Sequence, residues 1–223
     1  FSFCRNLRQH FNNQNMSMEA VSKGDLNRHV MISSQDEFAV MGRYTNFMIE
    51  MLKERNRQLE KTRQEIIQRL GRAAEYRDNE TGMHVVRMSH FSEALARKAN
   101  LSKEQCDLIL QASPMHDVGK IAVPDSILQK DAPLTDEEYA IMKIHPQRGA
   151  DMMKDCKKLE PLIPYCLYHH EQYDGSGYPH GLAGDLIPIQ GRLVAVADTF
   201  DAITSNRPYR DGRSAEVGLD IIL

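Results

Sequence analysis

Apolar residues in the first part of the chain recur at helical spacing. Leu52, Leu59 and Ile66 follow one another every seven positions, and the intervening seam positions hold Asn56, Arg63 and Leu70. A heptad repeat of this kind predicts a coiled coil, in which a seam Asn fixes register and oligomeric state at some cost in stability. We therefore expect a parallel dimeric stalk over residues 56–74. The alternative is one amphipathic helix packed on its own domain.

The chain after position 75 predicts a second helical region with short polar connections. Ser102 with Gln105, and Thr135 with Glu138, have the spacing of capping boxes, which mark helix N-termini. Pro146 suits the first turn of another helix. These signals predict an all-α fold.

Composition limits the class of protein. The chain has 223 residues, of which 41% are hydrophobic and 26% charged, as is ordinary for one large or two small globular domains. Its four cysteines form no CxxC pair, which favours reduced thiols over a disulfide framework or a zinc ribbon. No apolar run reaches the roughly 18 residues of a membrane span, and no signal peptide opens the chain. It begins without Met and stops inside an apolar pattern, so we expect a fragment cut at both ends.

Charge restricts the partners. From residue 76 onward, 22 Asp and Glu residues stand against 16 Lys and Arg residues. Such a surface repels polymeric nucleic acid, so we expect no nucleic-acid polymer as partner. A small dianionic nucleotide is still a feasible ligand, because bound divalent cations reverse the local charge.

Seven potential metal ligands lie in separate motifs of this acidic region. Imidazole nitrogens and carboxylate oxygens suit iron, manganese or zinc, and seven groups exceed the four ligands of one structural zinc. Two neighbouring metal ions are suited to in-line attack on phosphorus. The sequence therefore predicts hydrolysis of a phosphate ester. The seven residues are His84, His116, Asp117, His145, His169, His170 and Asp198.

The order of these motifs resembles the HD-GYP family, bacterial phosphodiesterases of cyclic di-GMP within the HD metal-dependent phosphohydrolases. The matching blocks, all within residues 75–223, are ETGMHVVR, HDVGK, HPQRG, HHEQYDGSGYP, ADTFDAIT and RPYR. The resemblance implies an HD-type helical bundle, incomplete at its C-terminus. Periodicity alone leaves the run LVAVA, residues 193–197, open between strand and helix, and the resemblance implies a helix. It also implies that Asp117 bridges two metals, with His84, His116 and Asp198 on the first and His145, His169 and His170 on the second.

Two further side chains have open roles. In some members of this family a glutamate four residues before the first histidine goes with a third metal, so Glu80 predicts two or three divalent ions, iron or manganese. Its alternative is a solvated helix acid. Lys120 stands one helical turn after His116, where an ammonium could stabilise a phosphate oxygen or protonate a leaving oxygen. A salt bridge is the alternative. We assign Asp117 and Lys120 as catalytic residues.

The resemblance also implies the substrate contacts, which are Gly177, Tyr178, Asp201, Arg207 and Arg210. Glycine permits close approach of the backbone to a ligand, and a tyrosine adds a hydroxyl donor and a flat face. The arginines offer paired donors for a phosphate or a guanine edge. We expect a cyclic-nucleotide phosphodiesterase that opens cyclic di-GMP to linear pGpG, with GMP as a further product.

Three alternatives remain open at this point. The first is an inactive module that binds cyclic dinucleotides or a partner. The second is an HD phosphohydrolase that acts on another nucleotide. The third is cyclic GMP-AMP as an alternative substrate.

Residues 1–55 have a signature of their own. GDL at 24–26, DE at 36–37 and a following helical run of apolar residues resemble a HAMP module that lacks its start. In that family two helices per subunit, joined by an extended connector, form a parallel four-helix bundle in a dimer. The resemblance implies a signal-transduction protein that forms a homodimer through HAMP and stalk. We expect the full-length protein to be anchored in the inner membrane upstream of residue 1, with this chain in the cytoplasm. A surface helical hairpin is the alternative.

Overall fold

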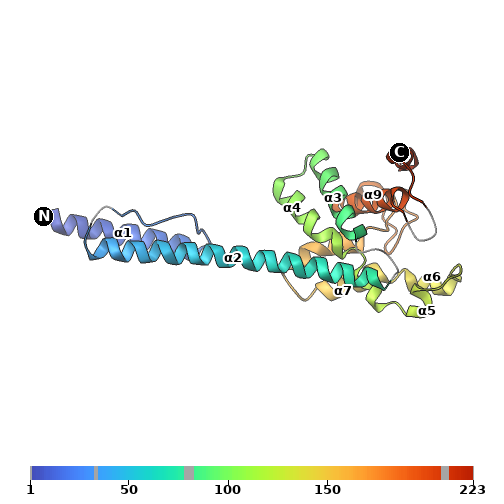
Figure 1. Ribbon diagram of the computed structural model, residues 1–223, viewed down its shortest axis with the longest axis horizontal. Coiled ribbons are helices and arrows are strands. Elements are labelled where there is room, and N and C mark those ends of the chain that lie inside the picture. Colours follow the sequence, from blue (N-terminus) through green and yellow to red (C-terminus); the bar gives the residue numbers. More distant parts are fainter. Residues whose placement is uncertain (1, 33–34, 78–82, 207–210, 223) are drawn as a thin grey trace. The chain divides into compact units, whose positions relative to one another are not determined.

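The computed structural model describes residues 2–32, 35–77, 83–206 and 211–222 (Figure 1). Within these ranges the regular elements are helices and no strand is present, apart from an isolated antiparallel bridge between Asp174 and Ala183. The predicted all-α fold is confirmed for this part of the chain. The chain divides into two compact units, Phe1–Arg63 and Gln64–Leu223.

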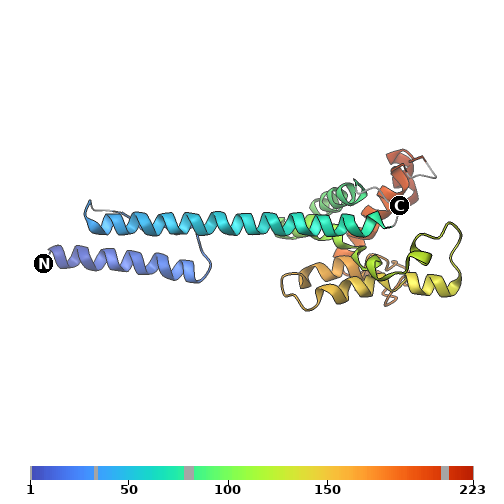
Figure 2. The ribbon, with the colours of Figure 1, turned by 60° about the horizontal axis from the view of Figure 1, so that its bottom comes forward.

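The first unit pairs two parallel helices. It contains α1 (Ser2–Ser22) and the first part of α2 (Glu37–Tyr76). The His10 ring of α1 stacks on Phe38 of α2, with ring centroids 5.6 Å apart. Further along both helices, Gln14 donates a hydrogen bond to Thr45 Oγ1. Contacts that advance together along both helices mean that they point the same way, and Figure 2 shows them side by side.

An extended connector makes this parallel arrangement possible. It leaves α1 through Gly24, whose φ of +86° is readily adopted only by glycine. The connector then returns along α2. The Asn46 side chain accepts a hydrogen bond from the Val30 N–H at 2.7 Å, and Lys53 Nζ donates to Asn27 Oδ1 at 3.2 Å. Connector and α2 therefore run antiparallel, which returns the chain to the start of α1.

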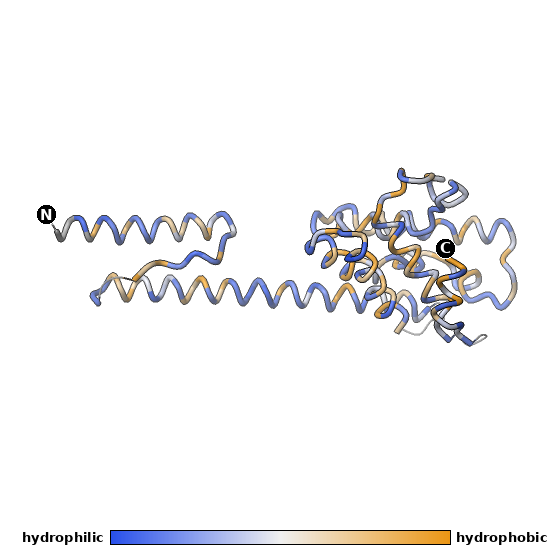
Figure 3. The backbone as a smooth tube through the Cα atoms, turned by 90° about the horizontal axis from the view of Figure 1, so that it is seen from above, coloured by the Kyte–Doolittle hydropathy of each residue, from blue (hydrophilic) through white to orange (hydrophobic). Residues whose placement is uncertain are grey.

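The predicted seam of α2 is solvent-exposed in the single chain. Leu52, Leu59 and Ile66 are 47, 67 and 51% exposed. Figure 3 shows the middle of this helix as mainly hydrophilic, with hydrophobic positions at intervals. Among the described residues, no helix is both long and apolar enough to cross a membrane.

The second unit is built from the end of α2 and a bundle of shorter helices. Helix α3 packs against both α4 and α9, while α7 packs against η2 and α8. The α-helices are α3 (Met83–Lys98), α4 (Lys103–Ala112), α5 (Asp125–Leu128), α6 (Asp136–Met142), α7 (His145–Met153), α8 (Ile163–Leu167), α9 (Ile189–Thr204) and α10 (Ala215–Ile222). The 3-10 helices are η1 (Ser113–Met115), η2 (Val118–Ala122), η3 (Glu160–Leu162) and η4 (Gly184–Leu186).

Local sequence signals set several of these helix boundaries. Ser102 and Thr135 both form the predicted capping boxes, at the starts of α4 and α6. Pro146 lies in the first turn of α7 as predicted. The LVAVA run lies inside α9, so its helical interpretation is confirmed.

One hydrophobic core joins these helices. Met88, Ile109, Met153 and Val194 are all less than 2% exposed and come from α3, α4, α7 and α9. Burial of such side chains stabilises the folded state by roughly 1.5–3 kcal/mol each. The three cysteines whose side chains the structure describes, Cys106, Cys156 and Cys166, are free thiols.

The end of α2 joins this core at a close helix contact. Ile67 and Ala74 are buried. Between them, a Cβ atom at Gly71 would lie 2.2 Å from the Pro114 carbonyl oxygen, which is closer than any side chain tolerates. Glycine at 71 therefore lets the helix backbone approach η1, which immediately precedes His116.

Candidate metal centre

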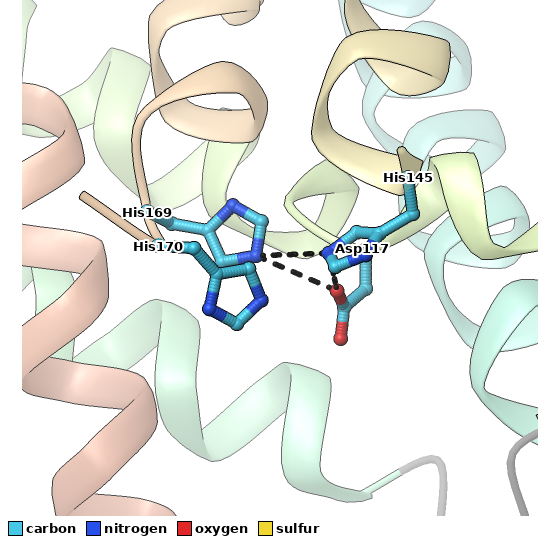
Figure 4. A group of neighbouring side chains, drawn as sticks. All are labelled: Asp117, His145, His169 and His170. Atoms are coloured by element: carbon cyan, nitrogen blue, oxygen red, sulfur yellow. Dashed lines mark hydrogen bonds and ion pairs between the residues drawn. The ribbon is translucent and has the colours of Figure 1, made fainter. Parts of the chain in front are cut away.

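One group of side chains meets at Asp117, between η1 and η2. Asp117 Oδ1 lies 3.1 Å from His145 Nε2 and 3.5 Å from His169 Nε2. Figure 4 shows both imidazoles turned toward this carboxylate, with His170 beside His169. One possible ligand atom of each of the four residues lies within 4.8 Å of the others. Helix α7 begins at His145, whereas His169 and His170 follow the C-cap residue of α8, Tyr168.

A second group lies on the other side of Asp117. His84 from α3, His116 after η1 and Asp198 from α9 also bring ligand atoms within 4.8 Å of one another. His84 Nε2 is 3.2 Å from Asp198 Oδ1. The second carboxylate oxygen of Asp117, Oδ2, lies 3.2 Å from His116 Nε2. Asp117 therefore presents one oxygen to each group, and the two groups are the ones that the HD-GYP resemblance implies.

Main-chain carbonyls orient three of these histidines. In each case Nδ1 pairs with the carbonyl oxygen three residues earlier: His116 with Ser113 at 2.9 Å, His145 with Met142 at 2.9 Å and His169 with Cys166 at 2.6 Å. A carbonyl only accepts, so Nδ1 must be the donor. In each neutral ring the lone pair is therefore on Nε2, the nitrogen that faces the site.

His84 is oriented by a side chain instead. Its Nδ1 pairs with Asp201 Oδ2 at 2.6 Å. Arg87 donates to both oxygens of the same carboxylate, from Nε at 2.6 Å and from Nη2 at 2.9 Å. A carboxylate behind a histidine fixes the ring and raises its basicity, as is usual for histidines that bind metals.

The electrostatics of both groups favour a cation. Burial disfavours the charged form of His84, but hydrogen bonds with Asp198 and Asp201 outweigh burial and raise its pKa to about 10. Burial would raise the pKa of Asp117, yet the nearby Lys120 and His116 hold it well below its usual range. Asp117 therefore stays ionised at neutral pH, as a metal-bridging carboxylate must be.

These residues fit divalent transition-metal ions. The donor set is imidazole nitrogen and carboxylate oxygen, the mixture that suits iron, manganese or zinc. Within the described part of the chain, His116 Nε2 is buried and makes no hydrogen bond, while the Asp117 Oδ2 atom lies 3.2 Å from it. Burial of a nitrogen lone pair without a partner costs free energy, which a bound cation would recover. The clustering is that of a metal-binding site.

Lys120 lies at the edge of the Asp117 group. Its Nζ is 2.8 Å from Asp117 Oδ2, so the salt bridge considered for it is present. The side chain is 16% exposed.

The loop after His170 folds back over that ring. The Tyr178 N–H donates to the His170 carbonyl at 3.2 Å, and the two rings stack with centroids 4.7 Å apart. A Cβ at Gly177 would lie 2.3 Å from the Gln172 nitrogen, so only glycine permits this turn. Burial raises the pKa of Tyr178, which keeps its hydroxyl protonated. Gly177 and Tyr178 thus lie next to the group formed by Asp117, His145, His169 and His170.

One predicted contact requires correction, and three lie outside the described residues. Asp201 was expected to touch substrate, but its side chain is 2% exposed and both its oxygens bind His84 or Arg87. The motif spacing could not show which way this side chain points. Glu80, Arg207 and Arg210 fall in the segments 78–82 and 207–210, of which the structure gives no description.

Sequence reasoning missed three residues at the site. Glu171 is buried and accepts hydrogen bonds from the N–H groups of His180 and Leu182, which ties down the loop. The HHE motif contained this signal. Lys143 Nζ lies 5.6 Å from the Tyr178 ring centroid, and Glu75 faces His84. Neither Lys143 nor Glu75 belongs to a matching motif.

A helical domain with this arrangement of histidine and aspartate defines a class of metal-binding proteins. Residues 46–223 match the HD domain family. The chain therefore belongs to the HD domain family.

Known proteins resemble the chain over most of its length. It is 36% identical over 234 residues to a cyclic di-GMP phosphodiesterase of Vibrio cholerae, a match that covers 98% of this chain and 48% of that protein. It is 43% identical over 164 residues to the cyclic di-GMP phosphodiesterase response regulator RpfG of Xanthomonas campestris, covering 73% and 43%. The chain thus spans about half the length of the curated relatives it matches.

A solved structure has a similar fold. The HDG"Y"P protein Bd1817 from Bdellovibrio bacteriovorus superposes with a TM-score of 0.50 at 26% identity, which covers 62% of this chain and 44% of that one.

A further sequence relative is the 3'3'-cGAMP-specific phosphodiesterase 2 of Vibrio cholerae. It is 44% identical over 155 residues, and the match covers 69% of this chain and 30% of that protein.

Proposed function

We propose that this chain is the metal-dependent phosphodiesterase part of a bacterial signalling protein of the HD-GYP type, which opens cyclic di-GMP to linear pGpG and onward to GMP. The observation that carries the proposal is the meeting of two His/Asp groups at the two oxygens of Asp117. The Vibrio and Xanthomonas relatives, both cyclic di-GMP phosphodiesterases, supply the substrate of this proposal.

The chain's own residues would hold and orient the reacting groups. A bound pair of divalent ions, iron or manganese, would supply a hydroxide for in-line attack and neutralise the phosphoryl oxygens. Asp117 would fix the spacing of the two ligand groups, since each of its oxygens faces one of them. Lys120, 2.8 Å from Asp117, would give a proton to the leaving oxygen or stabilise charge on phosphate.

Substrate recognition would fall to the loop around Tyr178. Its hydroxyl is a donor and its ring a flat surface for a base, while Gly177 allows close approach of the backbone. Arg207 and Arg210 remain our proposed phosphate or guanine contacts. Asp201 becomes a residue that positions His84, because the salt bridge with Arg87 occupies its carboxylate.

The first unit supports a HAMP-like, dimeric signalling role as part of this proposal. Its two parallel helices and extended connector have the connectivity of one HAMP subunit. The exposed heptad positions of α2 offer an apolar seam to a second copy. A full-length protein anchored in the inner membrane, with this chain in the cytoplasm, belongs to the same proposal.

One assay tests the activity. The chain is loaded anaerobically with Fe²⁺ or Mn²⁺ and incubated in separate reactions with cyclic di-GMP and 3'3'-cGAMP, and products are separated by chromatography. We expect pGpG from cyclic di-GMP. Exclusive cleavage of 3'3'-cGAMP would transfer the chain to the specificity of its 44% identical Vibrio relative. A fully metallated chain that cleaves neither would be a binding module.

A further inference from the structure

Glu75 brings a carboxylate to the metal centre from outside its motifs. It lies in the last turn of α2, the helix that starts at Glu37 in the first unit. Its side chain is only 3% exposed, and Oε1 lies 3.7 Å from His84 Nε2. An ionised carboxylate is costly to bury unless a positive group compensates for it.

The same nitrogen already faces a second carboxylate. Asp198 Oδ1 lies 3.2 Å from His84 Nε2. Because Nδ1 is bound to Asp201, Nε2 is the only ring nitrogen available to these two acids. Two carboxylate oxygens therefore converge on Nε2, which carries a proton at neutral pH because the pKa of His84 is raised to about 10. A divalent cation that displaced this proton to solvent would bind all three atoms.

The distances support a shared cation. Ligand atoms each about 2.1 Å from one ion lie roughly 3.0 Å apart at right angles and roughly 4.2 Å apart on opposite sides. The separations of 3.2 Å and 3.7 Å at His84 fall within that range. His84, His116 and Asp198 have ligand atoms within 4.8 Å of one another without Glu75, so we expect the Glu75 carboxylate to move closer to them when the ion binds. We propose that Glu75 is a further ligand of the ion held by His84, His116 and Asp198, so that α2 is itself part of the metal site.

The residue two positions on ties the end of α2 to the other ligand group. Arg77 donates to the Ile121 carbonyl at 2.7 Å and to the Val123 carbonyl at 3.1 Å, and pairs with Asp125 at 2.5 Å. These acceptors lie in or just after η2, which directly follows Asp117. Arg77 is therefore a positioning residue that holds the end of α2 against the segment carrying the bridging aspartate.

This arrangement gives α2 a direct chemical effect on the site. A helix rises 1.5 Å per residue, so an axial shift of that size would remove the Glu75 oxygen from ligand distance. Occupancy of the His84 ion would then depend on the position of α2. The inference rests on the proposed metal-dependent function and names the element through which that function is regulated.

Metal binding of Glu75→Gln tests the proposal, with Glu65→Gln, an exposed acid on the same helix, as the matched control. Full chains are titrated with Mn²⁺, bound metal is measured by mass spectrometry, and spin coupling between neighbouring ions is followed by electron paramagnetic resonance. We expect Glu75→Gln to lose at least about 10-fold in affinity at one site and to show the spectrum of uncoupled Mn²⁺. The control should match the native chain.

The metal affinity and spin coupling of the Glu75 variants decide whether Glu75 is a ligand. Native affinity and native spin coupling in folded Glu75→Gln would overturn the ligand assignment and leave Asp117-centred catalysis intact. If Glu75→Gln does not fold by circular dichroism, Glu75→Asp retains the charge on a shorter side chain and should weaken the same site. Unchanged affinity in Glu75→Asp would then refute the proposal. A native chain that binds no Mn²⁺ or Fe²⁺ would instead refute the proposed function.

Discussion

His84 Nδ1 and Asp201 Oδ2 lie 2.6 Å apart although 117 positions separate the two residues in the chain. This pair links α3 to α9 and sets which nitrogen of His84 faces Asp198. The bidentate contact from Arg87 keeps the Asp201 carboxylate ionised and in place. Orientation of this proposed metal ligand therefore depends on two side chains outside the groups of candidate ligands.

Asp201→Asn should weaken metal binding without removing a ligand. The amide loses the charge that supports His84 and the paired contact with Arg87, so we expect roughly 10- to 100-fold weaker affinity at one site. Titration with Mn²⁺ measures this, with the exposed Asp107→Asn as control. Native metal affinity together with a raised KM would restore Asp201 as a substrate contact.

Asp117→Ala should abolish hydrolysis and empty at least part of the site. Among the residues that the structure describes, no other carboxylate offers one oxygen to each ligand group, so the loss should exceed the roughly 100-fold typical of outer partners. Product formation and bound metal are measured together, with Asp131→Ala, an exposed loop aspartate, as control. Full turnover with native metal content would contradict the assignment.

Tyr178→Phe should leave metal content unchanged and impair substrate binding. Loss of one hydroxyl hydrogen bond predicts a KM raised by roughly 3- to 10-fold. Arg207→Ala, which removes a charged donor, should raise it by roughly 10- to 100-fold. Steady-state kinetics test both, with Tyr173→Phe, 67% exposed in the same loop, as control. Metal loss in either variant would mean that metal and substrate contacts have been misassigned.

Leu59→Asp combined with Ile66→Asp should dissociate a dimer. In a parallel coiled coil these charges would face their copies across the seam. Light scattering should report the mass of one chain, while Lys61→Asp with Gln68→Asp, two exposed positions off the seam, should preserve the native mass. An unchanged mass in the seam variant would assign α2 to packing within one chain.

Glu80→Gln should lower metal content by about one ion per chain. We place Glu80 four residues before His84, the spacing at which some HD-GYP members have a third metal. Metal analysis at saturation should therefore give three ions for the native chain and two for the variant. Two ions in both would leave a two-metal phosphodiesterase, and three ions in both, held less tightly by the variant, would make Glu80 an outer partner.

Local sequence patterns predicted the helices and their boundaries better than they predicted the contacts within the site. The capping boxes at Ser102 and Thr135 involve neighbours three residues apart, so the sequence alone identifies them. The LVAVA run was ambiguous because periodicity does not separate a buried helix from a buried strand over five residues. Its place in α9 follows from packing against α3, which no local pattern encodes.

The site residues that the motifs contain could be predicted from sequence, whereas those whose role depends on contacts between distant helices could not. Motif order alone predicted His84, His116 and the other five proposed ligands, because those residue types have a distinctive chemistry, and the structure gathers their side chains into two groups. Asp201 was given the wrong partner, since its role depends on a contact between distant helices. Glu75 was missed because it lies just after the predicted stalk of residues 56–74 and belongs to none of the matching motifs.

Carbonyl acceptors three residues before His116, His145 and His169 have an evolutionary consequence. The residues that supply them are Ser113, Met142 and Cys166, whose side chains carry a hydroxyl, a thioether and a thiol and take no part in the contact. Any residue has a main-chain carbonyl, so substitution at these positions leaves the acceptor in place whenever the turn is preserved. Sequences can therefore drift there without disturbing three of the imidazoles. His84 lacks this protection, because a single base change at Asp201 is enough to remove its support.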